Sequence, residues 1–291
     1  KNIFIVESDI KNNLYSFFFG DEKIAGGYLQ KFLPYSILFF YKKDSDLIKK
    51  FLIVFLIAHL TATLISGNRM PMIMTLFDLG LIFLILKNLR IKIFISFVGF
   101  LLISLYLFNH DGAINTAYKN FYYKVFSKTS SNNAERIYKE EGVEKKLNEY
   151  NFFSERYSTH HGLLYYKTYV SFKEKLILGK GIKSIQKSYP GEIFIPHPHN
   201  YQLEILHDSG LVGFLLLSIF TFIKLFQSIK IFNSSISNEK RFLIALAFVA
   251  FVAEIWPIKS TGSMYSTFSG STLWLTISLI NIIFYKDQKK L

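Results

Sequence analysis

Residues 92–108 read KIFISFVGFLLISLYLF, a run in which a single lysine is followed only by uncharged, mostly apolar residues. A helix needs roughly 17–25 such residues to cross the hydrocarbon core of a bilayer. A soluble domain would divide its apolar residues into shorter runs separated by charges. The stretch therefore predicts a membrane-spanning helix, and it indicates the fold class of the chain.

Other apolar blocks reach or approach the same length. They read IAGGYLQKFLPYSILFFY at 24–41, FLIVFLIAHLTATLIS at 51–66, MPMIMTLFDLGLIFLIL at 70–86, LVGFLLLSIFTFIKLF at 211–226, RFLIALAFVAFVAEIW at 241–256 and STLWLTISLINIIFY at 271–285. Gly26, Gly27 and Pro34 interrupt the first of them. The sequence thus predicts an all-α, polytopic bundle of about seven transmembrane helices.

The formal charge of the chain is +13, and the positions of its basic residues matter more than their number. Lysines and arginines gather in the short loops after the first, third and fifth blocks, and at the C-terminus. If the spans alternate, all these loops lie on one side, which the positive-inside rule makes the cytoplasm. The pattern indicates a membrane topology and argues against nucleic-acid binding.

The absence of cysteine and the N-terminal segment of the chain add two expectations. There is no cysteine, which excludes disulfides and thiolate metal sites. The chain begins with neither methionine nor a signal peptide, but with a polar segment that the topology places outside the membrane. We therefore expect it to be the C-terminal part of a longer membrane protein.

The predicted topology divides the chain into three parts. Residues 1–108 hold an outer segment and spans one to four, residues 109–209 form a large outer loop, and residues 210–291 hold spans five to seven. Within the loop, the charge and spacing of residues 134–157 are typical of a solvated helix. Residues 163–178 predict an amphipathic helix lying on the membrane surface. Nearly all polar material is therefore outside, where function is to be sought.

Arg69 lies at the outer end of the second span, between Gly67 and Pro71, which we expect to loosen the helix. An arginine near hydrocarbon usually faces a partner or a water-filled cavity. Its guanidinium offers a planar fork of donors to phosphate or carboxylate. Two interpretations stay open: an interfacial arginine that reaches for water, or an anion clamp.

Two pairs of histidines lie in the outer loop, His160–His161 and His197/His199. Neutral imidazole can accept a proton at physiological pH, so histidine is the usual general base. A structural, hydrogen-bonded role is the simpler interpretation for His197 and for His207. No carboxylate spacing supports a metal site, and none is predicted.

The residues after His199 predict the start of a helix. Asn200 can cap a helix that starts at Tyr201 and ends at Gly210. The N-terminus of such a helix presents backbone N–H groups to an anion. A base and an anion site can therefore lie side by side here.

Two acidic residues are placed inside apolar blocks, Asp78 in the middle of the third and Glu254 near the outer end of the sixth. An ionisable group in the middle of a span is a functional hypothesis by default. The alternative for Asp78 is a protonated or hydrogen-bonded residue at a contact between helices, and both interpretations stay open.

Starting at His199, the sequence reads His199-Asn200, nine residues, Gly210, two residues, Gly213. This resembles the H[NSQ]-x9-G-x-x-G motif of the O-antigen ligase and O-antigen polymerase family of bacterial inner-membrane proteins. Other segments look like that family in the same order: FGDEKIAGGYLQKFLPY, ISGNRMPMIM, KEKLILGKGIKS and WPIKSTGSMYST. The likeness covers nearly all of the chain.

The resemblance implies a GT-C-like membrane glycosyltransferase that needs no cofactor and no metal. Its donor would be a glycan linked to a polyprenyl diphosphate such as undecaprenyl diphosphate. The polyprenyl chain would lie among the membrane lipids. The acceptor would be a sugar hydroxyl on the periplasmic side, of lipid A-core for a ligase or of another lipid-linked repeat for a polymerase. Carried onto this chain, Arg69 is the diphosphate clamp and His199 the base. Diphosphate leaves readily once its charge is matched, so positioning and neutralisation are the main tasks of such an enzyme.

Further substrate-binding candidates follow from the same resemblance. The family often has a second arginine in the long loop, where this chain offers Arg156 and then His160 and His161. Asn200, Gly210 and Gly213 complete the predicted set. A cysteine often found before the HPHN segment of polymerase-like members is absent here, although GDE…GGYL slightly favours a polymerase.

Two other classes of function stay open. A transporter or flippase of lipid-linked anionic glycans would line its path with Arg69 and Asp78, and it would be expected to show repeated broken helices, which the sequence does not. A non-catalytic envelope assembly protein would use the outer loop to bind a partner.

Overall fold

The computed structural model describes residues 24–40, 46–112, 114–116, 118–119, 160–186, 197–234, 237–260 and 262–288. In this part of the chain every regular element is a helix, which confirms the all-α prediction. The helix predicted at 134–157 lies outside the described residues, as does Arg156.

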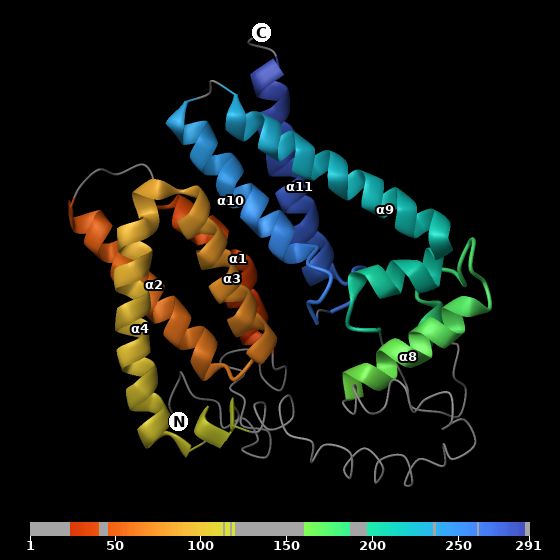
Figure 1. The fold of residues 1–291 in the computed structure, drawn as a ribbon, viewed down its shortest axis with the longest axis horizontal. Helices are drawn as coiled ribbons and strands as arrows, with labels where there is room; N and C mark the ends of the chain where they lie inside the picture. The colour runs from red at the N-terminus through yellow and green to blue at the C-terminus, as the bar shows by residue number, and fades with distance from the viewer. Residues whose placement is uncertain are drawn as a thin grey trace. The chain divides into compact units, whose positions relative to one another are not determined.

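Each of the seven apolar blocks forms a helix (Figure 1). In chain order these are α1 (Ala25–Leu38), α2 (Asp46–Ile65), α3 (Arg69–Ile85), α4 (Arg90–His110), α9 (Tyr201–Asn233), α10 (Asn238–Glu254) and α11 (Thr267–Gln288). The loop before α9 contains α8 (His160–Lys173), and single 3-10 turns form at η2 (Lys87–Leu89) and η5 (Ser184–Gln186).

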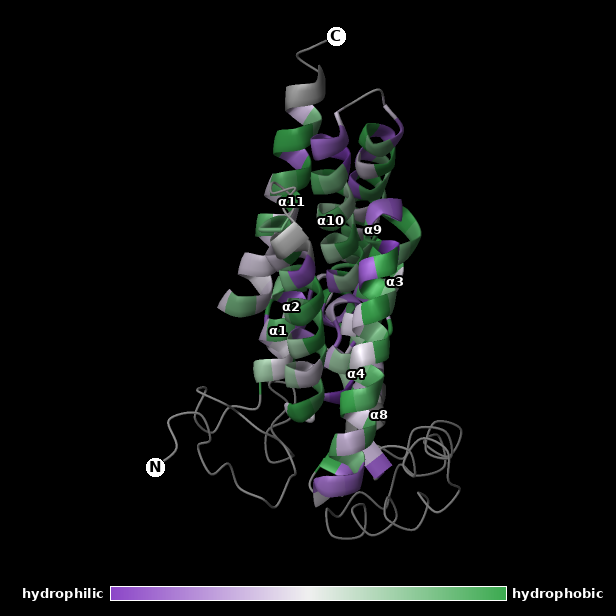
Figure 2. Ribbon diagram, turned by 90° about the vertical axis from the view of Figure 1, so that its left-hand side faces the viewer, coloured by the Kyte–Doolittle hydropathy of each residue, from purple (hydrophilic) through white to green (hydrophobic). Residues whose placement is uncertain are grey.

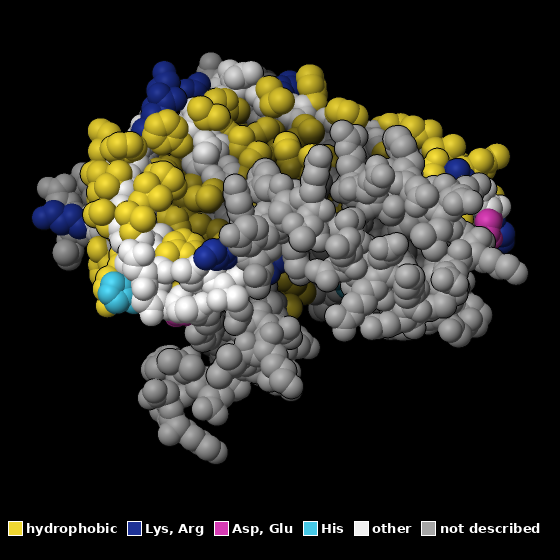
Figure 3. All heavy atoms as spheres, turned by 60° about the horizontal axis from the view of Figure 1, so that its bottom comes forward, with side chains coloured by type: hydrophobic (Ala, Val, Ile, Leu, Met, Phe, Trp, Pro, Cys, Tyr) yellow, Lys and Arg dark blue, Asp and Glu magenta, His cyan; other side chains and the backbone are white. Residues whose placement is uncertain are grey.

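Three segments of the described chain are long and apolar enough to cross a membrane, namely Lys87–His110, Tyr201–Asn233 and Thr267–Tyr285. Hydrophobic residues colour much of α4 in Figure 2, and hydrophobic side chains cover a broad part of the described surface in Figure 3. On α4 the side chains of Ile91 and Leu102 are exposed, as expected for a helix that faces lipid. The protein is therefore a helical membrane protein. That it has about seven spans remains a prediction.

The described residues form two compact units. The first consists of residues 24–119, 224–256 and 271–288, and the second of residues 160–223 and 257–270, within the gaps given above. The N-terminal part of α9 and the first turn of α11 belong to the second unit, and the remainder of both helices belongs to the first.

The first unit is a bundle in which α2 packs along α4, and α1 contacts α2, α3 and α10. Its core includes Leu33, Leu60, Ile82 and Val249, each fully buried. Because lipid tails are as apolar as leucine, helices in a membrane associate by close packing and polar contacts between them. Gly26 permits such packing, since a Cβ there would lie 2.5 Å from Ser66 Oγ.

The second unit is built around a break in α9. Gly210 has φ 63° and ψ −163°, which no α-helix accommodates, so the predicted end of the helix at this residue is confirmed and a second helical segment follows. The break interrupts the helical ladder and leaves backbone groups to be satisfied elsewhere. The loop after α8 supplies partners: Leu211 N–H donates to Leu176 O at 2.9 Å, and Val212 N–H donates to Ile177 O at 3.2 Å.

These bonds also explain where the amphipathic-helix prediction for residues 163–178 is wrong. The helix α8 ends at Lys173, and residues 174–178 form turns. The carbonyls of Leu176 and Ile177 are directed to α9 instead of to a continued α8. Leu176 is exposed, so it does not extend the apolar face on which Leu164 and Phe172 are buried.

Candidate functional site

In the first unit Arg69 is the first residue of α3, directly after a tight turn. Gly67, with φ 66°, ends α2, and the Ser66 hydroxyl donates to Thr63 O at 2.7 Å. Pro71 sits in the first turn of α3, where its missing N–H has no helical partner to lose. The expected loosening is therefore a complete helix break at Gly67, whereas Pro71 belongs to a regular helix.

The half-buried guanidinium of Arg69 lies near the phenol of Tyr118. The Tyr118 hydroxyl donates to Leu64 O at 3.1 Å, which attaches it to the end of α2. Burial raises the pKa of Tyr118 to about 12, although the charge of Arg69 acts in the opposite direction. The phenol therefore stays neutral at physiological pH and does not cancel the positive charge beside it.

In the second unit His197 and His199 form a pair just before α9. Their ring atoms His197 Nε2 and His199 Nδ1 are 3.1 Å apart, a hydrogen-bonding distance, and the ring centroids are 4.2 Å apart. Both side chains are partly buried. His199 has φ 54°, a left-handed conformation that is uncommon for a residue other than glycine.

Asn200 caps α9, as predicted. Its Oδ1 accepts the Leu203 N–H at 3.0 Å, and its Nδ2 donates to Pro257 O at 2.6 Å. One side chain thus satisfies an orphan donor of the helix and also joins the helix to the loop before α11. A role for Asn200 in substrate binding stays a prediction.

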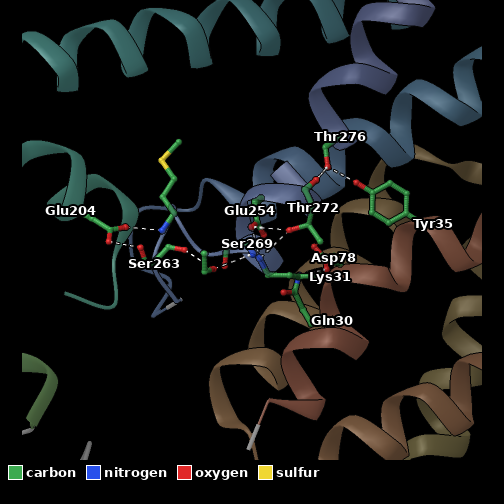
Figure 4. A network of polar contacts seen from close by, with 12 residues as sticks. Gln30, Lys31, Tyr35, Asp78, Glu204, Glu254, Ser263, Ser269, Thr272 and Thr276 are labelled. Carbon is green, nitrogen blue, oxygen red and sulfur yellow. Dashed lines mark hydrogen bonds and ion pairs between the residues drawn. The ribbon is translucent and has the colours of Figure 1, made fainter. Parts of the chain in front are cut away.

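Glu204, one turn into α9, makes a second connection to the same loop (Figure 4). Its carboxylate accepts from Ser263 Oγ and from Met264 N, each at 2.6 Å. Glu204 was not among the predicted site residues, and the signal for it was an acidic residue in the first turn of α9.

His207 and Asp208 form a buried network with Ser171 of α8. His207 Nε2 lies 2.9 Å from Ser171 Oγ, and His207 Nδ1 lies 2.7 Å from Asp208 Oδ1. Asp208 Oδ2 also accepts the Lys183 N–H at 2.6 Å. The order of atoms is that of a Ser-His-Asp triad, but none of the three residues is more than 3% exposed. The network joins the loop after α8 to α9, and the burial of its side chains favours the structural interpretation of His207.

The glycines of the predicted motif have a packing cause. A Cβ on Gly210 would lie 2.3 Å from Ile177 O, and one on Gly213 would lie 2.2 Å from Ser209 Cβ. Gly179 faces the same break, since its Cβ would lie 2.5 Å from Asp208 O. The spacing G-x-x-G therefore follows from the shape of the break, and substrate binding by Gly210 and Gly213 stays a prediction.

The remaining predicted residues are placed only in part. His160 and His161 begin α8, and their side chains lie outside the described residues, as does Arg156. Among the residues that the structure describes, no group of three or more His, Asp or Glu side chains is arranged to hold a metal ion.

A polar cluster crosses the interior of the first unit (Figure 4). Lys31 of α1 forms an ion pair with Glu254 of α10, and its Nζ lies 3.2 Å from Thr272 Oγ1 of α11. Gln30 Nε2 donates to Asp78 Oδ2 at 2.8 Å. Asp78 is fully buried, so the geometry favours the contact between helices over a residue lining a translocation path.

Residues 52–218 match the family model described as O-antigen ligase. The match covers more than half of the chain, and its range includes both Arg69 and His199. No curated protein and no solved structure matches the chain.

Proposed function

The chain belongs to the O-antigen ligase family, and we propose that it is a membrane glycosyltransferase of the O-antigen ligase or polymerase type. Its donor is a polyprenyl-diphosphate-linked glycan and its acceptor a sugar hydroxyl, of lipid A-core or of another lipid-linked repeat. The reaction takes place at the periplasmic face of the bacterial inner membrane. Both the donor and the acceptor are anchored in the membrane by a lipid.

The observation that carries this proposal is the geometry around His199. The residue is followed directly by a capped helix, and Asn200 and Glu204 tie that helix to the loop before α11. A ring held on such a support can be positioned accurately, which is what general base catalysis requires.

In the proposed reaction His199 takes the proton from the acceptor hydroxyl. The acceptor oxygen then bonds to the anomeric carbon of the donor glycan, and the bond from that carbon to the phosphate oxygen breaks. The electron pair leaves with the polyprenyl diphosphate. Arg69 offers its guanidinium to this anion, since a planar fork of donors matches two phosphate oxygens.

The test is glycan profiling of cells that lack the full-length gene and are complemented with wild type, His199→Ala or Arg69→Ala. Loss of a general base typically costs about 10²–10⁴-fold in rate. We therefore expect neither variant to restore the normal product. His110→Ala, a change at the exposed end of α4, serves as the control and should restore it.

The species that accumulates identifies the branch. Single-repeat caps on lipid A-core in the variants would indicate a polymerase. Uncapped core with accumulated lipid-linked polymer would indicate a ligase. A normal ladder from both variants would contradict the proposed site and favour a transport or assembly role.

A further inference from the structure

The geometry of the histidine pair before α9 restricts which ring nitrogens carry protons. His197 Nε2 and His199 Nδ1 lie 3.1 Å apart, and the two rings are inclined by 61°. A hydrogen bond at this distance needs one proton between the two nitrogens, since two would repel and none would leave two facing lone pairs. Only two arrangements are therefore compatible with two neutral rings.

In the first arrangement His199 carries its proton on Nδ1 and donates it to His197 Nε2. The other ring nitrogen of His199, Nε2, is then unprotonated and can act as a base. In the second arrangement His197 Nε2 donates to His199 Nδ1. His199 Nε2 then carries the proton and cannot accept another. The state of His197 thus decides whether His199 Nε2 is a base or a donor.

The local backbone holds this pair in place. Pro198, between the two histidines, is buried, and its ring limits its own φ. His199 adopts φ 54°, and non-glycine residues in such conformations are retained where the surrounding structure specifies them. Here the next residue, Asn200, is held in place, because its side chain is hydrogen-bonded both to α9 and to Pro257 O. This restricts the backbone that follows His199. The rings therefore do not meet by chance contact of two mobile side chains.

We propose that His197 is a positioning residue that accepts the Nδ1 proton of His199 and so fixes the tautomer in which His199 Nε2 is the base. This inference rests on the proposed function, in which His199 deprotonates the acceptor. When His199 Nε2 takes the acceptor proton, the Nδ1–H bond to His197 becomes charge-assisted and therefore stronger. His197 thus stabilises the imidazolium without contacting the substrate.

The test replaces His197 by side chains that differ in reach and in whether they can accept a hydrogen bond. Glutamate places a carboxylate oxygen where Nε2 of histidine lies and can only accept, whereas lysine can only donate. Glutamine reaches the same place and can accept, and asparagine, shorter by one methylene, is its matched control. Full-length variants are compared in their initial rate of glycan transfer from lipid-linked donor extracted from cells lacking the gene.

We expect His197→Glu and His197→Gln to retain transfer, with His197→Glu the more active of the two. His197→Lys and His197→Asn should lose at least about tenfold in kcat, since a wrongly protonated histidine is inactive as a base. KM for donor and acceptor should not change, because His197 does not touch either. Equal thermal midpoints of the four variants would show that the differences are not caused by loss of folding.

Two results would overturn the inference while leaving the proposed function intact. If His197→Lys is active and His197→Glu is not, the proton resides on His197. If all four variants transfer glycan at the wild-type rate, His197 does not act on His199. A fully active His199→Ala in the same assay would instead contradict the proposed base, and the inference would fall with it.

Discussion

Glu254→Ala is expected to lower the free energy of unfolding by about 3–5 kcal/mol, the range for breaking a buried ion pair by removing one partner. The carboxylate pairs with Lys31, and the two side chains are only 4% and 6% exposed. Removing it leaves an ammonium group in the interior of the first unit with Thr272 Oγ1 at 3.2 Å, a neutral group that cannot balance the charge. The cost is therefore the loss of the anion that offsets the desolvation of this buried charge.

The double variant Lys31→Met/Glu254→Leu is the informative companion. Replacing both members of a buried pair by apolar residues of similar size is often neutral or stabilising. We expect this protein to recover most of the loss caused by Glu254→Ala. Thr272 and Tyr35 would keep polar groups near the small cavity beside the pair, so recovery need not be complete.

The measurement is the thermal midpoint of the purified protein in detergent. Glu239→Ala, at the exposed start of α10, is the matched control and should change stability by no more than about 1 kcal/mol. If Glu254→Ala is as stable as this control, the ion pair does not hold α1 against α10. A double variant less stable than Glu254→Ala would point to a loss of packing instead of a loss of charge compensation.

Gly210→Ala is expected to destabilise the protein by about 3 kcal/mol or more, since glycine-only backbone conformations cost about 1–3 kcal/mol before any clash is counted. At φ 63° and ψ −163° an alanine side chain is strained whatever space surrounds it. The space is also missing, because its Cβ would lie 2.3 Å from Ile177 O and 2.6 Å from Gly179 N, both backbone atoms. Ile177 O accepts the Val212 N–H and Gly179 N donates to Lys175 O, so neither atom can move without breaking a backbone hydrogen bond.

The same substitution should also reduce glycan transfer, because the segment that carries Asn200 and Glu204 ends at this break. Gly80→Ala in α3 is the control: a Cβ there meets nothing within 4 Å, and glycine inside a helix costs up to about 1 kcal/mol relative to alanine. We expect Gly80→Ala to be neutral or slightly stabilising. A Gly210→Ala protein with a wild-type thermal midpoint would show that α9 can continue unbroken.

The sequence was sufficient for the helices and for the start and the break of α9, which depend on neighbours along the chain. The apolar blocks predicted the helices, because backbone groups in an apolar environment must bond within the segment. Asn200 predicted the start of α9 and Gly210 its break, because a cap and a left-handed glycine act within one helical turn. The family resemblance came from the same local spacings, and the matching family model confirmed it.

Other features required partners from distant parts of the sequence. Lys31 and Glu254 are 223 residues apart, and neither residue by itself shows that the other neutralises it. The sequence predicted that α8 continues beyond Lys173, because the periodic pattern of apolar residues continues there. In the structure the carbonyls of Leu176 and Ile177 instead accept hydrogen bonds from α9. The contacts of Glu204 with Ser263 and Met264 likewise depend on where the folded backbone places each side chain. Sequence determines local conformation through short-range sterics and hydrogen bonding, but only the tertiary structure decides which buried polar groups satisfy one another.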